Sequence, residues 1–233
     1  RYISFVAGSI LYNSKSFTLV FSLLMLIALY ESNELWKKIR LNNPKYNYPI
    51  PQAYVVLSMT TLILLPFYFS NSYNPFPILL IFILIWISDT MSYFFGSYFG
   101  NTKMRIKVSP NKTWEGFIGG FLCSSIFSIV SFSYIQEIYP FWKTISLGIL
   151  IPIFGLIGDI YQSKLKRMAG VKDSGSILPG HGGIFDRLDS AMGVSYVSFL
   201  ICLLYTSDAA DDRMSVCLGG GGMMKKGGGG GGG

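Results

Sequence analysis

Long apolar stretches separated by short polar segments dominate this chain of 233 residues. A helix needs about 20 mostly apolar residues to cross the roughly 30 Å hydrocarbon core of a bilayer. Seven stretches approach or reach that length: 1–12, 17–31, 53–70, 76–97, 115–135, 142–158 and 188–201. The pattern predicts an all-α fold, a polytopic integral membrane helical bundle with about six to seven membrane segments.

Several of these stretches are polar for helices that face lipid on all sides. Pro66 interrupts one, Asp89 lies in the lower half of another, where it ends the apolar run 78–88, and 115–135 is rich in Ser and Gly. Such features are typical of helices packed against one another. Gly116 and Gly120 indicate either a close approach to a neighbouring helix or a flexible helix start, and both interpretations stay open.

The charges of the loops predict how the chain is oriented in the membrane. Loops 32–52, 98–114 and 159–187 each carry four or five Lys and Arg residues, whereas the turns 71–75 and 136–141 carry none. Two crossings separate each neighbouring pair of basic loops, so all three lie on one face. The excess of positive charge predicts that this face is cytoplasmic.

Composition agrees with a membrane protein and narrows the chemistry. Only 13% of residues are charged, about half the share usual in soluble domains, and 16% are aromatic, which excludes a disordered chain. The net charge is +7. His181 is the only histidine, and Cys123 is the only cysteine before residue 202, so the sequence argues against a zinc site or a disulfide framework.

The last 32 residues differ from the rest. The segment 202–212 places a polar, acidic string within an apolar stretch and resembles the translation of a transposase-type sequencing adapter, and glycine runs follow it. We therefore expect a membrane domain at 1–201, truncated at both ends, and a non-native or disordered Gly-rich tail at 202–233. A genuine flexible tail is the alternative.

Aspartate placement is the sharpest chemical signal. The five aspartates before residue 202 are Asp89, Asp159, Asp173, Asp186 and Asp189. A mixed basic and acidic loop beside a membrane is commonly a solvated surface attracted to anionic lipid. Asp89 and Asp159 resist that interpretation because they end apolar runs, where an unpaired acid is costly and usually functional.

These residue types together suit phosphate chemistry. Carboxylates are ligands that Mg²⁺ prefers, and neighbouring Lys and Arg side chains donate to phosphate oxygens. The turn 179–183, Pro-Gly-His-Gly-Gly, frees backbone N–H groups to approach an anion. The pattern predicts a metal-assisted phosphate-transfer site in cytoplasmic catalytic loops.

Three ordered motifs carry a specific resemblance. They are Trp-Ile-Ser-Asp-Thr-Met-Ser-Tyr-Phe-Phe-Gly at 86–96, Ser-Pro-Asn-Lys-Thr-Trp-Glu-Gly at 109–116, and Ser-Lys-Leu-Lys-Arg at 163–167, followed by Lys-Asp at 172–173 and Leu-Pro-Gly-His-Gly-Gly-Ile-Phe-Asp-Arg-Leu-Asp at 178–189. Over roughly 30–201 the chain resembles the phosphatidate cytidylyltransferases, also called CDP-diacylglycerol synthases.

The resemblance implies a nucleotidyltransferase of phospholipid biosynthesis that moves cytidylyl from CTP to phosphatidate, giving CDP-diacylglycerol and pyrophosphate. It implies Mg²⁺ as cofactor, CTP, phosphatidate and the lipid bilayer as partners, and a bacterial-type inner or plasma membrane. The basic loops border the bilayer, so nucleic acid is not expected. A monovalent ion and a homodimer stay open.

The resemblance also implies roles for individual residues. The metal ligands are Asp159 and Asp186, with Asp189 completing or supporting the site. The catalytic set adds Lys166 and Arg187. The substrate-binding set is Lys112, Ser163, Lys164, Arg167, Lys172, Asp173, His181, Gly182, Gly183 and Asp89. For Asp89 a hydrogen bond between helices is the alternative, and for Asp173 and His181 a structural role in the loop.

Two other functions remain as alternatives. A CTP-dependent lipid kinase of the polyprenol or phytol type would use similar basic and acidic blocks, but the complete motif at 172–189 favours the cytidylyltransferase. A non-catalytic polytopic membrane protein, such as a scaffold or transporter, is the alternative of another class. Transporters often show repeated halves and charges near the midplane. This sequence shows neither feature, and it has no P-loop.

Overall fold

The computed structural model describes residues 2–42, 48–67, 73–136, 140–175 and 182–203. Within these ranges the regular elements are all helices, and an isolated bridge joins Lys103 to Thr113. The helices are α1 (Tyr2–Tyr12), α2 (Ser14–Asn42), α3 (Ile50–Leu64), α4 (Phe76–Phe99), α5 (Trp114–Ile135), α6 (Phe141–Met168) and a final helix, Asp189–Leu203, with the 3₁₀ turns η1 (Leu65–Phe67) and η2 (Phe185–Arg187). The predicted all-α fold is confirmed.

Each of the seven predicted stretches coincides with a helix. Five helical segments are long and apolar enough to cross a membrane, namely α2, α3 extended by η1, α4, α5 and α6, whereas α1 and the final helix are shorter. Pro66 lies in η1, immediately after α3 ends, as expected for a residue that lacks a backbone N–H. The predicted helical membrane bundle is therefore confirmed.

Two helices continue well beyond their apolar stretches. α2 runs to Asn42 and α6 to Met168, so the predicted loops 32–52 and 159–187 both begin as helix. Hydropathy marks where the apolar stretch ends, but Lys, Arg, Glu and Leu are strong helix formers and carry the helix further. As a result, three basic residues predicted in a loop project from the last turns of α6: Lys164, Lys166 and Arg167.

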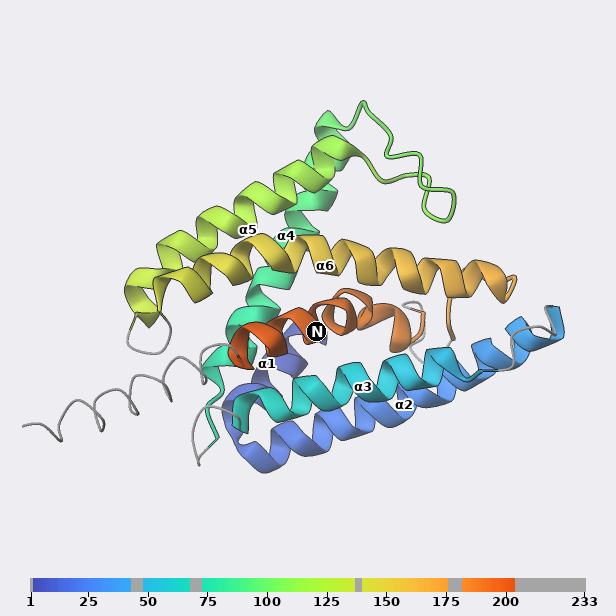
Figure 1. Cartoon of the computed structure of the whole chain (residues 1–233), viewed down its shortest axis with the longest axis horizontal. Helices are drawn as coiled ribbons and strands as arrows, with labels where there is room; N and C mark the ends of the chain where they lie inside the picture. The colour runs from blue at the N-terminus through green and yellow to red at the C-terminus, as the bar shows by residue number, and fades with distance from the viewer. Residues whose placement is uncertain (1, 43–47, 68–72, 137–139, 176–181, 204–233) are drawn as a thin grey trace, which may run out of the picture.

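The helices form a bundle with α6 at its centre (Figure 1). α5 packs against α4 and α6, and α2 packs against α3. The final helix lies between α6 and α3, where the Tyr196 hydroxyl donates to the Tyr54 carbonyl at 3.1 Å. The carboxyl ends of α2 and α6 and the connection from α4 to α5 all lie at the right-hand end of Figure 1, so the basic segments share one end of the bundle.

Small residues allow α4 and α5 to approach closely. A Cβ atom added at Gly120 would lie 2.6 Å from the Ser88 carbonyl oxygen, and one at Gly116 would lie 2.7 Å from the Ser92 carbonyl oxygen. Both distances are shorter than real Cβ contacts and both involve backbone atoms, so a larger residue at either position would push the two helices apart. The close approach suggested by the spacing of Gly116 and Gly120 is confirmed.

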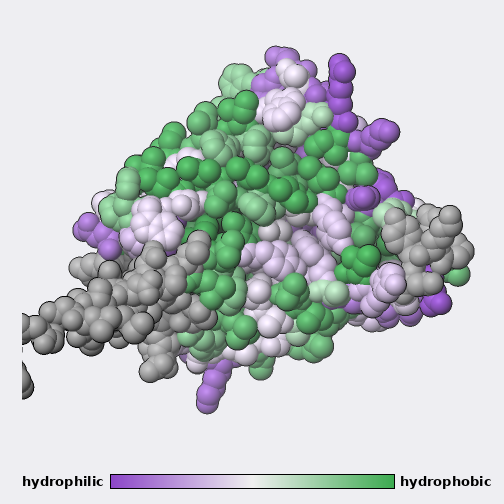
Figure 2. All heavy atoms as spheres, viewed as in Figure 1, coloured by the Kyte–Doolittle hydropathy of each residue, from purple (hydrophilic) through white to green (hydrophobic). Residues whose placement is uncertain are grey.

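The outer surface separates into an apolar and a polar region. Hydrophobic atoms cover most of the visible face over α5 and α6, while hydrophilic atoms gather at the end that holds the connection from α4 to α5 (Figure 2). Ile118, Leu122 and Ile126 are exposed along α5. Exposed side chains of this kind on a long helix suit contact with lipid.

Candidate active site

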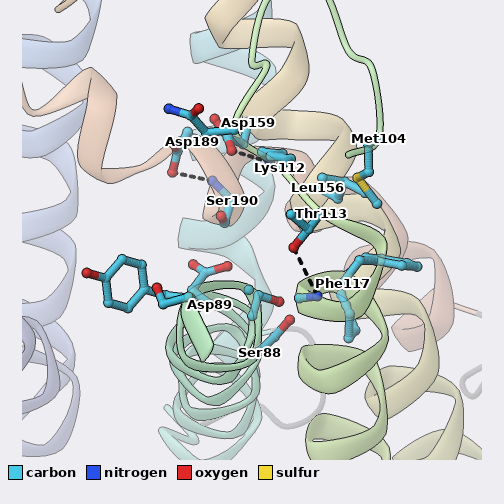
Figure 3. Close-up of a pocket in the computed structure, with 18 residues that line it drawn as sticks. Ser88, Asp89, Met104, Lys112, Thr113, Phe117, Leu156, Asp159, Asp189 and Ser190 are labelled. Atoms are coloured by element: carbon cyan, nitrogen blue, oxygen red, sulfur yellow. Dashed lines mark hydrogen bonds and ion pairs between the residues drawn. The ribbon is translucent and has the colours of Figure 1, made fainter. Parts of the chain in front are cut away.

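A pocket of about 490 Å³ lies between α4, the start of α5, α6 and the start of the final helix (Figure 3). The pocket lies near the basic end of the bundle. Its lining includes Thr113, which is the last residue of the connection from α4 to α5, and residues from the second half of α6. Three carboxylates and one ammonium group line it: Asp89, Asp159, Asp189 and Lys112.

The three carboxylates come from three helices that are far apart in the sequence. Asp89 belongs to α4, Asp159 to α6 and Asp189 to the first turn of the final helix, and each of the three charges repels the other two. Asp189 accepts a hydrogen bond from the Ser190 backbone N–H at 2.7 Å, and Asp89 lines the same pocket as Ser190. Asp89 therefore belongs to the pocket together with the first turn of the final helix.

A crossing of two glycines brings Asp159 and Asp189 together. A Cβ atom at Gly158 would lie 2.8 Å from the Gly193 Cα and 2.6 Å from the Asp189 carbonyl oxygen. The backbones of α6 and the final helix therefore touch next to both carboxylates. Larger side chains at this crossing would move the two helices apart and separate the acids.

The connection from α4 to α5 presents Lys112 to this cluster, and several backbone bonds hold the connection in place. The Met104 N–H donates to the Lys112 carbonyl at 2.9 Å, and the Thr102 N–H donates to the Glu115 carboxylate at 2.9 Å. Thr113 caps α5 by accepting from the Gly116 N–H at 3.3 Å. The Lys112 ammonium group then forms an ion pair with Asp159.

The charges that line the pocket favour a cation. Three carboxylates face one ammonium group, so the lining carries an excess of negative charge. Within the described part of the chain, no group of three or more Asp, Glu, His or Cys side chains is arranged to hold a metal ion. Mg²⁺ commonly takes only one or two protein carboxylates together with water and substrate phosphates, and the carboxylates present fit that requirement.

Asp186 lies outside the pocket lining and is held by a separate set of donors. Its Oδ1 atom pairs with the Lys166 Nζ at 2.7 Å, and its Oδ2 atom accepts from the Ser174 N–H at 2.8 Å and the Ser174 hydroxyl at 3.0 Å. Burial alone would raise the pKa of Asp186, but the bonds from Lys166 and Ser174 outweigh it and lower the pKa below its usual value. Asp186 is therefore held as a carboxylate.

Comparison with known proteins places the chain in a family. The sequence model of a family described as "Cytidylyltransferase family" matches residues 3–205. The chain belongs to this family. A phosphatidate cytidylyltransferase of Staphylococcus haemolyticus is 47% identical over 128 residues, which cover 55% of this chain and 49% of that protein.

Similar relatives carry the same name. The phosphatidate cytidylyltransferase of Staphylococcus saprophyticus is 46% identical over 117 residues, covering 50% of this chain and 45% of that protein. That of Staphylococcus aureus strain COL is 44% identical over 128 residues, covering 55% and 49%. The chain spans about half the length of the curated relatives it matches. The family resemblance predicted from the motifs is confirmed.

The structure divides the predicted residues of this cytidylyltransferase-family chain into groups. Lys112, Asp89, Asp159 and Asp189 meet at the pocket, and Ser163 donates to Asp159 at 3.3 Å. Asp186 and Lys166 form the neighbouring ion pair, with the Gly183 N–H 3.4 Å from Asp186. The side chains exposed around this end are Lys164, Arg167, Lys172, Asp173 and Arg187. Gly182 adopts a φ of +79°, which favours glycine, and His181 lies outside the described residues.

Sequence reasoning missed three polar residues around the site. Ser174 and Ser190 contact the predicted acids, but a single Ser in a polar segment gives no signal of its own. Glu31 is 2% exposed and accepts hydrogen bonds from the segment that contains Asp186. A signal for Glu31 did exist, because it ends the apolar stretch 17–31 as Asp89 and Asp159 end theirs.

Proposed function

We propose that the chain carries the reaction centre for transfer of cytidylyl from CTP to phosphatidate, which yields CDP-diacylglycerol and pyrophosphate. The observation that carries this proposal is the pocket in which Asp89, Asp159, Asp189 and Lys112 meet at the basic end of a helical membrane bundle. Family membership and the similarity to the Staphylococcus phosphatidate cytidylyltransferases support it. The basic residues at that end support a cytoplasmic location for the site.

In this reaction a phosphate oxygen of phosphatidate attacks the α-phosphorus of CTP. A new P–O bond forms, the bond from the α-phosphorus to the bridging oxygen breaks, and pyrophosphate leaves with that electron pair. The attacking oxygen is already anionic at neutral pH, so the reaction does not require a strong general base. The main obstacle is the repulsion between two polyanions, which positive groups at fixed positions reduce.

We assign the metal to the carboxylates that line the pocket. Asp159 and Asp189 would hold Mg²⁺, and a bound Mg²⁺ would offset phosphate charge on the nucleotide. Asp89 adds negative charge beside them. Asp186 lies outside the pocket lining and is bound by Lys166 and Ser174, so we place it as the residue that holds Lys166 near the pocket, where the Lys166 charge acts on Asp189.

The cations act on the phosphates of the two substrates. Lys112 pairs with Asp159, and an incoming phosphate would offer it a second anionic partner in the same place. The exposed basic residues at the end of α6 and around η2 would contact the triphosphate and the lipid phosphate: Lys164, Arg167, Lys172 and Arg187. These contacts bring the two polyanions together before the reaction.

Labelled CTP tests the proposal directly. Membranes that contain the chain are incubated with phosphatidate, Mg²⁺ and CTP that carries label either in the cytosine ring or in the γ-phosphate. We expect cytosine label in the lipid fraction and γ-label in soluble pyrophosphate. Label from the γ-phosphate in lipid would show a lipid kinase instead, and neither label in lipid would contradict the proposal.

A further inference from the structure

Glu31 is a buried acid on α2 that the proposed reaction does not use. Its side chain is 2% exposed, and its two carboxylate oxygens accept three hydrogen bonds. The donors are the Phe185 N–H at 2.8 Å, the Ser174 hydroxyl at 3.1 Å and the Ile184 N–H at 3.2 Å. All three donors lie more than 140 positions further along the chain, in the segments on either side of residues 176–181.

The backbone of those segments is shaped around the Glu31 carboxylate. A Cβ atom at Gly183 would lie 2.5 Å from the Glu31 Oε2 atom, and a Cβ atom at Gly175 would lie 2.7 Å from Oε1. Side chains at these positions would displace the carboxylate. Gly183 is the last glycine of the motif at 179–183, so its contact with Glu31 gives that motif position a structural reason.

Ser174 connects Glu31 to Asp186. Its hydroxyl lies 3.1 Å from the Glu31 Oε2 atom and 3.0 Å from the Asp186 Oδ2 atom. A hydroxyl has one hydrogen, so the two carboxylates share a single donor. The N–H groups of Ile184 and Phe185 add a second connection, because Phe185 directly precedes Asp186.

We propose that Glu31 is a positioning residue that fixes the segment 182–187 to α2, so that Asp186 holds Lys166 beside the pocket. Glu31 acts through backbone groups and Ser174 and does not touch the reacting atoms. The expected loss of turnover in Glu31 variants rests on the proposed function. The attachment of the segment 182–187 to α2 is independent of that function. A carboxylate suits this role because it only accepts, and all three groups that face it are donors.

The variant Glu31→Gln in the full chain tests this role, with Glu34→Gln as the matched control. Glu34 lies one turn further along α2 and pairs with Lys37 at the surface. The glutamine amide group in Glu31→Gln would place a donor against the donors of the segment. Hydrogen exchange followed by mass spectrometry should show faster exchange in a peptide that covers 182–187, with no change in peptides from α4 and α5. Glu34→Gln should leave exchange unchanged everywhere.

Turnover of CTP and phosphatidate gives the second readout. We expect kcat to fall about tenfold or more in Glu31→Gln, a loss typical of a displaced catalytic group, and to recover in part in Glu31→Asp, which keeps an acceptor.

If exchange in 182–187 stays at the parental rate, Glu31 does not hold the segment. If exchange rises while kcat stays parental, the positioning role is wrong. If Glu31→Gln does not fold, Glu31→Asp decides by the same two readouts. If the parent transfers no cytidylyl, the proposed function fails and exchange alone tests the attachment.

Discussion

Removal of the Lys166 ammonium group should destabilise the chain strongly. In the variant Lys166→Met the Asp186 carboxylate, 15% exposed, loses a partner at 2.7 Å that is itself 13% exposed. At an effective dielectric constant of about 20, two charges at that distance attract by about 6 kcal/mol before desolvation is counted. Because a partly buried charge then keeps only its Ser174 and Gly183 donors, we expect the free energy of unfolding to fall by about 2–4 kcal/mol.

The double variant Lys166→Met/Asp186→Asn separates lost attraction from lost packing. Asparagine keeps an acceptor for the Ser174 donors but carries no charge, so no buried charge is left unpaired. The double variant should recover about 2 kcal/mol or more of the loss, since replacing both members of a buried ion pair is often nearly neutral. Lys164→Met, an exposed position on the same helix, should change stability by only about 0.5 kcal/mol.

Unfolding by SDS in mixed micelles, followed by circular dichroism, measures these differences. Each variant is titrated at neutral pH, where Asp186 is ionised in the folded chain. A loss below about 1 kcal/mol in Lys166→Met would be the value of an exposed ion pair and would refute the buried pair. A double variant no more stable than Lys166→Met would also refute the reasoning, because the unpaired charge would then not be the cause.

Three further outcomes follow from the packing and the charges. Gly193→Ala should destabilise the chain by about 1–3 kcal/mol in the same titration, because its Cβ atom would lie 2.7 Å from the Gly158 Cα. Gly8→Ala is the control and should not destabilise the chain, since a Cβ atom there would have no neighbour within 4 Å. The lowered pKa of Asp186 contributes stability that is fully present above the unfolded pKa, about 4, and is lost as pH falls through the folded pKa. The gap between the melting temperatures of the parent and Asp186→Asn should therefore begin to close only below about pH 4 and close further as the pH falls; a constant gap would contradict this. Chelation by EDTA should stop cytidylyl transfer, and added Mg²⁺ should restore it; full activity in excess EDTA would exclude the metal.

Much of the fold could be predicted because lipid imposes a strict length and hydropathy on a membrane helix. The apolar stretches located all seven helices, and Pro66 marked the end of α3. Hydropathy did not locate the carboxyl ends of α2 and α6, because helix propensity and not the apolar pattern decides where a charged helical extension stops.

The charged residues that line the pocket could be selected from the sequence, but their arrangement could not be predicted. Charge placement and motifs selected Asp89, Asp159 and Asp189, yet the contact between the last two depends on the Gly158–Gly193 crossing, which no local pattern reveals. The position of Glu31 at the end of an apolar stretch was a signal, but its role could not be predicted because its partners lie more than 140 positions away. Long-range contacts of this kind are fixed by tertiary packing alone.

The most direct test of the central claim, that the pocket is the reaction centre, is the rate of cytosine-label transfer in Asp159→Asn. The variant is compared with the parent and with Glu34→Gln at equal amounts of folded protein in the membrane. Loss of a group that organises charge at a reacting phosphate typically lowers the rate by about 10²–10³, and we predict a loss of that size in Asp159→Asn with a parental rate in Glu34→Gln. A rate in Asp159→Asn close to that of the parent would contradict the account.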